Sequence, residues 1–340
     1  IFTTKAKKGA IIYLEIEMIN ILRSEVKFMK NSAGKKQVKN KFNNKDEIII
    51  DFENITKNYG SKRVINDFNL QLKKGEVLAI LGKNGAGKTT LFKMLLNIIS
   101  LDKGKITIMG ESNKRSKIRE NISFLGEDYQ LYSYLTAEEI IDLASKFYNE
   151  YDKNWALNKL EDFDIPLSEK VSKFSKGMKQ TLKLVQSLAN KGEIIILDEP
   201  TAGLDVKMQN EITSLIKEIN EKGKTVLFSS HNLLEVKKLA ERVAFMKKGE
   251  IVAVKDKSFI SREENKIIFV PQKKIDDNQL VIDGVTAIEK NGSKYTIYYD
   301  KNEKEIIKHL NNYPYFKLEY GESNLEEFFL EITGGDDNSN

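Results

Sequence analysis

The chain contains no cysteine among its 340 residues, which excludes disulfides, thiol catalysis and metal sites with cysteine ligands. Histidine is almost as scarce, because only His231 and His309 are present, so we do not expect a metal site built from several histidines. No apolar run reaches the roughly 18–20 uncharged residues that a membrane-spanning helix needs. We therefore expect any function at a membrane to depend on a separate membrane-embedded partner.

The excess positive charge is confined to the N-terminal segment. Residues 1–46 hold 11 Lys or Arg against 4 Asp or Glu, a net charge of +7, whereas the remaining residues hold 44 against 46. The basic character therefore does not belong to the main body of the chain, and no nucleic-acid partner is expected. Because residues 30–45 are rich in lysine and asparagine, residues 1–46 are predicted to form a basic, flexible arm. The alternative is a basic contact with anionic lipid or with a partner.

The segment Gly82–Thr90 has the form G-x-x-x-x-G-K-[ST]. The apolar run Glu76–Leu81 before it is typical of a buried parallel strand, and Leu91–Ile99 after it is long and apolar enough for a helix. This order predicts a loop whose backbone N–H groups surround phosphate oxygens, and it disfavours a chance glycine-rich turn. We expect Lys88 to reach the β- and γ-phosphates and Thr89 to ligate Mg²⁺. The predicted nucleotide-binding residues of this loop are Gly82, Lys83, Asn84, Gly85, Ala86, Gly87, Lys88, Thr89 and Thr90.

The order of apolar patterns predicts an α/β domain at residues 47–254, since short buried strands alternate with helices. A helical insert is expected at about residues 130–190, where the apolar period changes to 3.6 and Thr136–Glu139 has the pattern of a capping box. A small α+β domain is expected at residues 255–333, with a hairpin that turns at Asn291-Gly292. Residues 334–340 are predicted to be a flexible tail.

A pair of carboxylates follows the apolar run Glu193–Leu197. Asp198 and Glu199 are predicted to lie at the carboxyl end of a core strand, where open α/β sheets present their ligands. Asp198 is placed to hold Mg²⁺ together with Thr89. Glu199 is placed to accept a proton from the attacking water. The alternative, a solvated turn, is disfavoured by the phosphate loop upstream.

The segment Lys173–Gln180 resembles the signature of ATP-binding-cassette (ABC) ATPases, whose family form is roughly L-S-G-G-Q. Ser175 and Gly177 match this form, whereas Phe174, Lys176 and Met178 depart from it. The resemblance implies that Ser175 and the backbone of Gly177 bind the γ-phosphate of an ATP held by another subunit. Taken alone, Ser175 could equally be an ordinary helix cap.

Three further positions match the family in its order along the chain, and a fourth departs from it. Tyr59 resembles the aromatic that stacks on adenine, and Asp205 ends a loop, Ala202–Asp205, that resembles the one crossing the dimer interface. His231 follows a predicted strand and resembles the histidine that contacts the γ-phosphate. Glu127 stands where most of the family has glutamine; we expect it still to ligate Mg²⁺, with an altered pH dependence.

The resemblance covers roughly residues 47–254 and implies an α/β fold of the P-loop NTPase type. It implies an ATPase that uses ATP and Mg²⁺, with Glu199, His231 and Lys88 as the catalytic residues. Two copies would bind head to tail, with the ATPs sandwiched between the phosphate loop of one and the signature of the other.

One cassette without a membrane span resembles the separate ATPase subunit of a bacterial ABC transporter, held at the cytoplasmic face of the cell membrane by permease subunits. We expect the permease to contact residues 128–135, because exposed aromatic residues suit interfaces. The Glu127 variant, the signature and the short C-terminal domain together resemble the exporters of drugs, antibiotic peptides or polysaccharides. The alternative is a soluble ABC ATPase that acts in translation, on DNA or as a regulatory or immunity switch. The transported substrate is not read from this chain, because its pathway lies in the permease.

Overall fold

The computed structural model describes residues 47–127, 129–148, 150–260, 264–323 and 325–333. The predictions made for residues 1–46 and for the tail at 334–340 fall outside these ranges. Within them, no helix is both long enough and apolar enough to cross a membrane.

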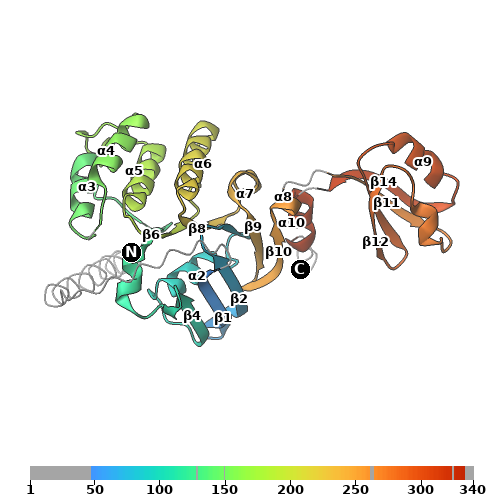
Figure 1. Ribbon diagram of the computed structural model, residues 1–340, viewed down its shortest axis with the longest axis horizontal. Helices are drawn as coiled ribbons and strands as arrows, with labels where there is room; N and C mark the ends of the chain where they lie inside the picture. Colours follow the sequence, from blue (N-terminus) through green and yellow to red (C-terminus); the bar gives the residue numbers. More distant parts are fainter. Residues whose placement is uncertain (1–46, 128, 149, 261–263, 324, 334–340) are drawn as a thin grey trace, which may run out of the picture.

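A six-stranded sheet forms the centre of the molecule, with the order β10-β9-β3-β8-β7-β6 (Figure 1). Neighbouring strands from β6 to β9 are parallel, and β10 pairs with β9 in the antiparallel sense. The residues of β3, β7 and β8 are all buried, as predicted for strands covered on both faces. The strands are β3 (Val77–Leu81), β6 (Ile122–Leu125), β7 (Ile194–Asp198), β8 (Thr225–Ser230), β9 (Arg242–Lys247) and β10 (Glu250–Asp256).

A second, antiparallel sheet with the order β2-β1-β4-β5 covers one face of the central sheet, and helix α2 lies between them (Figure 1). Leu78 and Ile80 of β3 share a hydrophobic cluster with Phe92 of α2 and Phe52 of β1. Helix α2 ends before the predicted limit at residue 99, and Asn97 beyond it adopts a left-handed backbone with φ 55°. The elements are β1 (Ile48–Tyr59), β2 (Lys62–Lys73), α2 (Lys88–Leu95), β4 (Lys103–Ile108), β5 (Glu111–Ser112) and the 3-10 helix η1 (Ser116–Asn121).

Helices cover the other face of the central sheet (Figure 1). Val77, Ala79 and Leu81 of β3 alternate with Leu78 and Ile80 and point to this face. They belong to a second hydrophobic cluster, which includes the buried residues of these helices. The first helix has the predicted capping box, since Thr136 Oγ1 accepts from the Glu139 N–H and Glu139 Oε2 accepts from the Thr136 N–H. The elements are α3 (Ala137–Ser145), α4 (Lys153–Asp162), η2 (Val171–Lys173), α5 (Lys176–Leu188), α6 (Val206–Glu221) and α7 (Leu233–Leu239).

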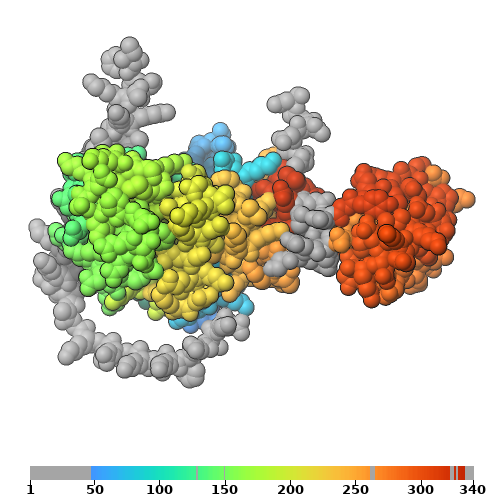
Figure 2. Space-filling model, turned by 90° about the horizontal axis from the view of Figure 1, so that it is seen from above, coloured from blue at the N-terminus to red at the C-terminus, as the bar shows by residue number. Residues whose placement is uncertain are grey.

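Residues 264–323 form a separate C-terminal module, a four-stranded antiparallel sheet with the order β12-β13-β11-β14 and one helix. Figure 2 shows it as a distinct globule at one end of the molecule. Its hairpin turns through Gly292-Ser293, one residue later than predicted, because Asn291 still pairs with Lys294. The elements are β11 (Glu264–Pro271), η3 (Asp277–Leu280), β12 (Val285–Asn291), β13 (Lys294–Tyr299), α9 (Glu303–Leu310) and β14 (Tyr315–Ser323).

The structure differs from the expected domain at 255–333 at both ends of that range. Helices α8 (Lys257–Ile260) and α10 (Leu325–Thr333) pack on the cassette, not on the module. Leu325 is fully buried in the cassette cluster, and the Phe328 ring lies 5.0 Å from the rings of both Phe245 and Phe259. The module is therefore inserted between two short helices that belong to the cassette core.

Candidate nucleotide-binding site

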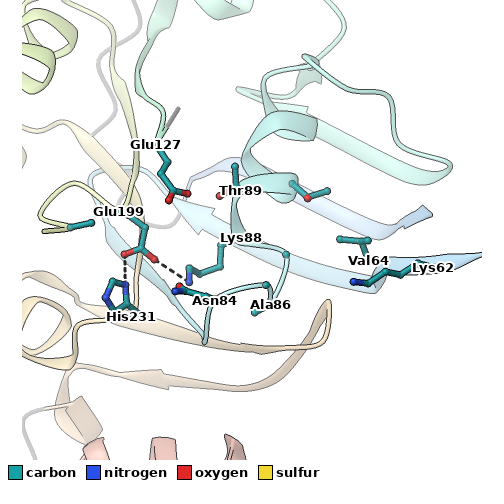
Figure 3. Close-up of a pocket in the computed structure, with 13 residues that line it drawn as sticks. Lys62, Val64, Asn84, Ala86, Lys88, Thr89, Glu127, Glu199 and His231 are labelled. Carbon is teal, nitrogen blue, oxygen red and sulfur yellow. Dashed lines mark hydrogen bonds and ion pairs between the residues drawn. The ribbon is translucent and has the colours of Figure 1, made fainter. Parts of the chain in front are cut away.

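A pocket of about 540 Å³ lies where the loop after β3 meets the carboxyl ends of β7 and β8 (Figure 3). It brings together the predicted loop with Glu127, Glu199 and His231 from three other parts of the chain. The residues that line it are Lys62, Val64, Asn84, Gly85, Ala86, Gly87, Lys88, Thr89, Thr90, Glu127, Glu199, Ala202 and His231. Gly82 and Lys83 contribute carbonyl groups beneath the pocket instead of lining it.

Glycine is required at two points of the loop. Gly87 has φ 108°, and a Cβ atom there would lie 2.7 Å from Ile65 Cδ1. A Cβ atom at Gly82 would lie 2.5 Å from the carbonyl oxygen of Met246 in β9. The loop therefore folds tightly between β2 and β9 and starts helix α2 at Lys88. The first N–H groups of that helix have no intrahelical acceptor and suit phosphate oxygens.

Lys88 lines the pocket but is largely buried, with 6% of its surface exposed. Its ammonium donates to the Gly82 carbonyl over 2.6 Å and lies 3.1 Å from Oε1 of Glu199. The loop thus holds one buried cation at the point where a phosphate would bind. Its counter-ion in this structure is the predicted general base.

Glu199 joins the phosphate loop to the histidine after β8, as Figure 3 shows. Its Oε2 lies 2.7 Å from Nδ1 of His231, while its Oε1 faces Lys88. The residue has φ 51°, which is uncommon for a side chain larger than glycine and is typical of functional sites. Its N–H donates to Ser229 Oγ over 3.0 Å, and this hydrogen bond fixes the turn. The three predicted catalytic side chains are therefore in direct contact.

Asp198 lies behind the pocket, with 1% of its surface exposed. Its Oδ1 accepts from Ser229 Oγ over 2.5 Å, and within the described residues its Oδ2 is buried with no hydrogen-bond partner. Burial raises the pKa of this carboxyl, while the hydroxyls of Ser229 and Thr89 lower it. An orphaned carboxylate oxygen beside a threonine hydroxyl suits a hard cation such as Mg²⁺.

No three His, Cys, Asp or Glu side chains among the described residues lie close enough together to form a metal site. The predicted donors Thr89, Asp198 and Glu127 include only two carboxylates. This donor set fits Mg²⁺, which proteins usually hold through one or two carboxylates together with phosphate oxygens and water. It does not fit a metal that needs a complete cage of protein ligands.

Tyr59 does not line the pocket. It ends β1, where it pairs with the pocket residue Lys62, and half of its surface is exposed. The ammonium of Lys57 lies 5.5 Å from the centre of its ring. The ring is thus free to stack beside the pocket mouth, and its contact with adenine stays a prediction.

The signature residues and Asp205 also lie outside the pocket. Ser175 caps helix α5 by accepting from the Met178 N–H over 3.1 Å, and Asp205 caps α6 in the same way from Met208 over 2.9 Å. A Cβ atom at Gly177 would approach no atom closer than 3.8 Å, so packing within one chain does not require glycine there. Both caps are exposed, and their role toward a nucleotide stays a prediction.

Sequence reasoning missed several residues of the site. Lys62 and Val64 line the pocket from β2, and only the pairing of β2 with β1 above the loop brings them there. Glu235 near the start of α7 is buried behind His231, although its place in the first turn of a helix is typical of an exposed capping residue. Neither the approach of β2 to the loop nor the burial of Glu235 leaves a pattern in the sequence.

Comparisons with known proteins identify relatives of the whole chain. A model of the ABC transporter family matches residues 65–202. The linearmycin resistance ATP-binding protein LnrL of Bacillus subtilis is 31% identical over 310 residues, which cover 84% of this chain and 98% of LnrL. The chain belongs to the ABC transporter ATP-binding proteins. The bacitracin transport ATP-binding protein BcrA of Bacillus licheniformis is also 31% identical, over 84% of this chain and 98% of BcrA.

Solved ABC cassettes share the fold. The dimeric structure of the bacterial ABC transporter cassette MJ0796 matches with a TM-score of 0.57 and 26% identity, over 62% of this chain and 99% of that one. A post-hydrolysis form of MJ0796 bound to ADP and Pi matches with a TM-score of 0.56. The predicted α/β P-loop core is therefore confirmed, and the chain is the ATP-binding, ATP-hydrolysing subunit of an ABC transporter. The non-transport alternative is not favoured.

Proposed function

We propose that this ABC ATPase powers an exporter of antibiotic-like compounds and that Lys88, Glu199 and His231 carry out its ATP hydrolysis. The observation that carries the assignment of residues is the contact of Glu199 with Lys88 at 3.1 Å and with His231 at 2.7 Å. One carboxylate thus touches both the phosphate-loop cation and the histidine at the opposite wall of the pocket. From these positions Glu199 would hold the attacking water, while Lys88 and His231 would hold the γ-phosphate beside it.

The three side chains have distinct tasks in this proposal. Lys88 neutralises the β- and γ-phosphates, and a phosphate in the loop competes with Glu199 for its ammonium. Glu199, released from that ion pair, accepts a proton from the attacking water. His231 orients Glu199 through Oε2, and as an imidazolium it has a second N–H that donates to the γ-phosphate.

Mg²⁺ is the cofactor that the donor set fits, and we assign Thr89, Asp198 and Glu127 to it. When bound, Mg²⁺ neutralises charge on the β- and γ-phosphate oxygens. Asp198 is held for this role by Ser229, which fixes its Oδ1 and leaves Oδ2 without a hydrogen-bond partner among the described residues. Glu127 follows β6 and is exposed at the pocket wall.

The nucleotide site is completed by a second copy in this proposal. Ser175 and Asp205 are exposed and Gly177 is half-buried, and none of the three, at or near the starts of α5 and α6, lines the pocket of its own chain. The cassette MJ0796, whose structure is dimeric, supports a pair of cassettes as the working form. We therefore assign these three residues to the ATP of the partner copy.

The permease contact is assigned to the aromatic residues at the start of the helical insert. Tyr129, Tyr132 and Tyr134 are all exposed, and the rings of the last two lie 5.8 Å apart. Phe147 and Tyr148, just after the end of α3, add two more exposed aromatic rings. Such a surface suits a protein interface. A permease bound to this surface would hold the ATPase at the cytoplasmic face of the membrane.

The relatives indicate the class of substrate. LnrL is a linearmycin resistance protein, and BcrA is a bacitracin transport protein. The chain covers 98% of each, so the likeness extends beyond the core that solved cassettes share. We therefore assign this subunit to an exporter that removes antibiotics of this kind.

The test is co-expression of the chain with a multi-span permease from a neighbouring reading frame. The proposal expects the two to purify together from membranes and to lower sensitivity to an antibiotic in a susceptible host. Glu199→Gln should abolish the protection but not the co-purification, whereas the surface variant Glu193→Gln should preserve both. Protection by Glu199→Gln equal to that of the wild type would exclude hydrolysis-driven export.

A further inference from the structure

Glu235 is a buried carboxylate with an unusual position behind the site. Only 4% of its surface is exposed, and among the described residues its Oε1 makes no hydrogen bond. Its Oε2 accepts from Ser230 Oγ over 2.5 Å. A glutamate is almost never buried in this way unless it is paired, because leaving water disfavours the charged form. The groups around Glu235 must therefore stabilise its carboxyl in this buried position.

The hydrogen bonds around Glu235 join the two catalytic segments. Ser230, which precedes His231, accepts from the Asn232 N–H over 2.9 Å and donates to Glu235. The hydroxyl of Thr201, two residues after Glu199, also interacts with the carboxyl of Glu235 and favours its ionised form. The carboxylate of Glu235 is thus hydrogen-bonded to the end of β8, directly before His231.

We propose that Glu235 is a positioning residue for ATP hydrolysis, whose ionised carboxylate holds His231 against Glu199 by accepting the hydrogen bond of the neighbouring Ser230 hydroxyl. The proposal rests on the roles proposed above for Glu199 and His231. Glu235 does not line the nucleotide pocket, so it acts through these two residues and not on the substrate.

The charge state of Glu235 changes near neutral pH. Burial raises its pKa to about 7, and the negative charge of Glu199 adds to this rise. The hydroxyls of Ser230 and Thr201 and the nearby His231 act in the opposite direction. A protonated carboxyl is a weaker acceptor for the two hydroxyls, since charge-assisted hydrogen bonds are the stronger ones. Turnover should therefore fall as the pH falls through about 7.

A purely structural role predicts something different. Asn232 caps α7, and the link through Ser230 resembles a capping box in which a serine relays the bond. If Glu235 only stabilised the start of this helix, its replacement would change the unfolding temperature but not the pH dependence of turnover. The two roles are therefore separable by measurement.

The experiment compares wild type, Glu235→Gln and Ser230→Ala in the full-length chain assembled with its permease. Glu241→Gln is the matched control, because Glu241 is an exposed glutamate just beyond the same helix. kcat and KM for ATP are measured from pH 5.5 to 9, and thermal unfolding is followed in parallel. Glu199→Gln is included to test the proposed function itself.

We expect Glu235→Gln to lower kcat at pH 8 by on the order of 10- to 100-fold, as displaced catalytic groups do, with KM within about twofold of wild type. The fall of kcat below about pH 7 should disappear in Glu235→Gln, and Ser230→Ala should show the same pattern. Wild-type kcat and pH profile in Glu235→Gln would overturn the proposal. If Glu235→Gln does not fold, a wild-type pH profile in Ser230→Ala overturns it.

The variants of Glu199 and Glu235 distinguish the proposed function from the role of Glu235. Hydrolysis that persists in Glu199→Gln would remove the proposed function together with the role of Glu235. Hydrolysis that is lost in Glu199→Gln, while Glu235→Gln behaves like Glu241→Gln, would remove the role of Glu235 alone.

Discussion

The ammonium of Lys88 lies 3.1 Å from Oε1 of Glu199, and the side chains of both residues are less than 10% exposed. A buried ion pair adds little net stability, but removal of one partner leaves an uncompensated buried charge. We expect Lys88→Met to lower the free energy of unfolding by about 3 kcal/mol. The double variant Lys88→Met/Glu199→Gln should recover most of this loss. Urea unfolding without nucleotide checks both values; additive losses in the cycle would contradict the pairing.

Hydrolysis and nucleotide binding should separate at Glu199. Glu199→Gln keeps the size of the side chain but removes its basicity, so ATP should still bind while turnover falls by at least about 100-fold. Because the ATP is not hydrolysed, the two copies that share it should stay bound to each other. Light scattering should then detect a dimer in the presence of ATP and Mg²⁺. Glu193→Gln, at the other end of β7, serves as the control and should hydrolyse ATP normally. A variant that stays monomeric in ATP would contradict the shared site.

Glu127 provides a test of the metal assignment. It lines the pocket together with Thr89, and its carboxylate adds a charge to the donor set of Thr89 and Asp198 (Figure 3). We expect Glu127→Ala to raise the Mg²⁺ concentration needed for half-maximal turnover by roughly tenfold, as the loss of one supporting ligand does. Glu127→Gln keeps a neutral oxygen and should show a smaller rise. Unchanged Mg²⁺ dependence in Glu127→Ala would show that the assignment is wrong.

Glu235 should make stability and activity depend on pH in opposite directions. Its pKa rises from an ordinary value of 4.5 to about 7 on folding, so between these values the folded chain binds more protons than the unfolded chain. Its contribution to stability is therefore largest below pH 4.5 and falls as the pH rises to about 7, by about 3 kcal/mol in all. Urea unfolding at pH 5.5 and 8 measures this. Glu235→Gln should lack the decrease that Glu241→Gln retains.

Much of the site was predictable because its residues follow strands in a fixed order. A glycine loop after a buried strand and two carboxylates at the end of another define the phosphate and metal positions of an α/β sheet. These patterns predict Lys88 and Glu199, the family resemblance adds His231, and the structure brings the three residues together. Glu235 was not identified, because burial depends on how α7 packs behind β8 and leaves no pattern in the sequence.

The boundary of the C-terminal domain was harder to predict, for a related reason. The apolar pattern of Leu325–Thr333 indicates a helix but does not indicate which core receives it. Phe328 lies against Phe245 of β9, far away along the chain, and that contact assigns the helix to the cassette. A strand-rich segment between two cassette helices resembles a terminal domain in sequence, although it is an insertion in the fold.

A matched pair of leucines tests this boundary. Leu325 in α10 and Leu310 in α9 are both fully buried, the first in the cassette core and the second in the core of the module. Each Leu→Ala change should cost about 2–5 kcal/mol in the unit that contains it. Leu325→Ala should lower the unfolding temperature of the transition that ATP stabilises, whereas Leu310→Ala should leave that transition in place. Calorimetry with and without ATP makes the comparison, and the reverse result would place α10 in the module.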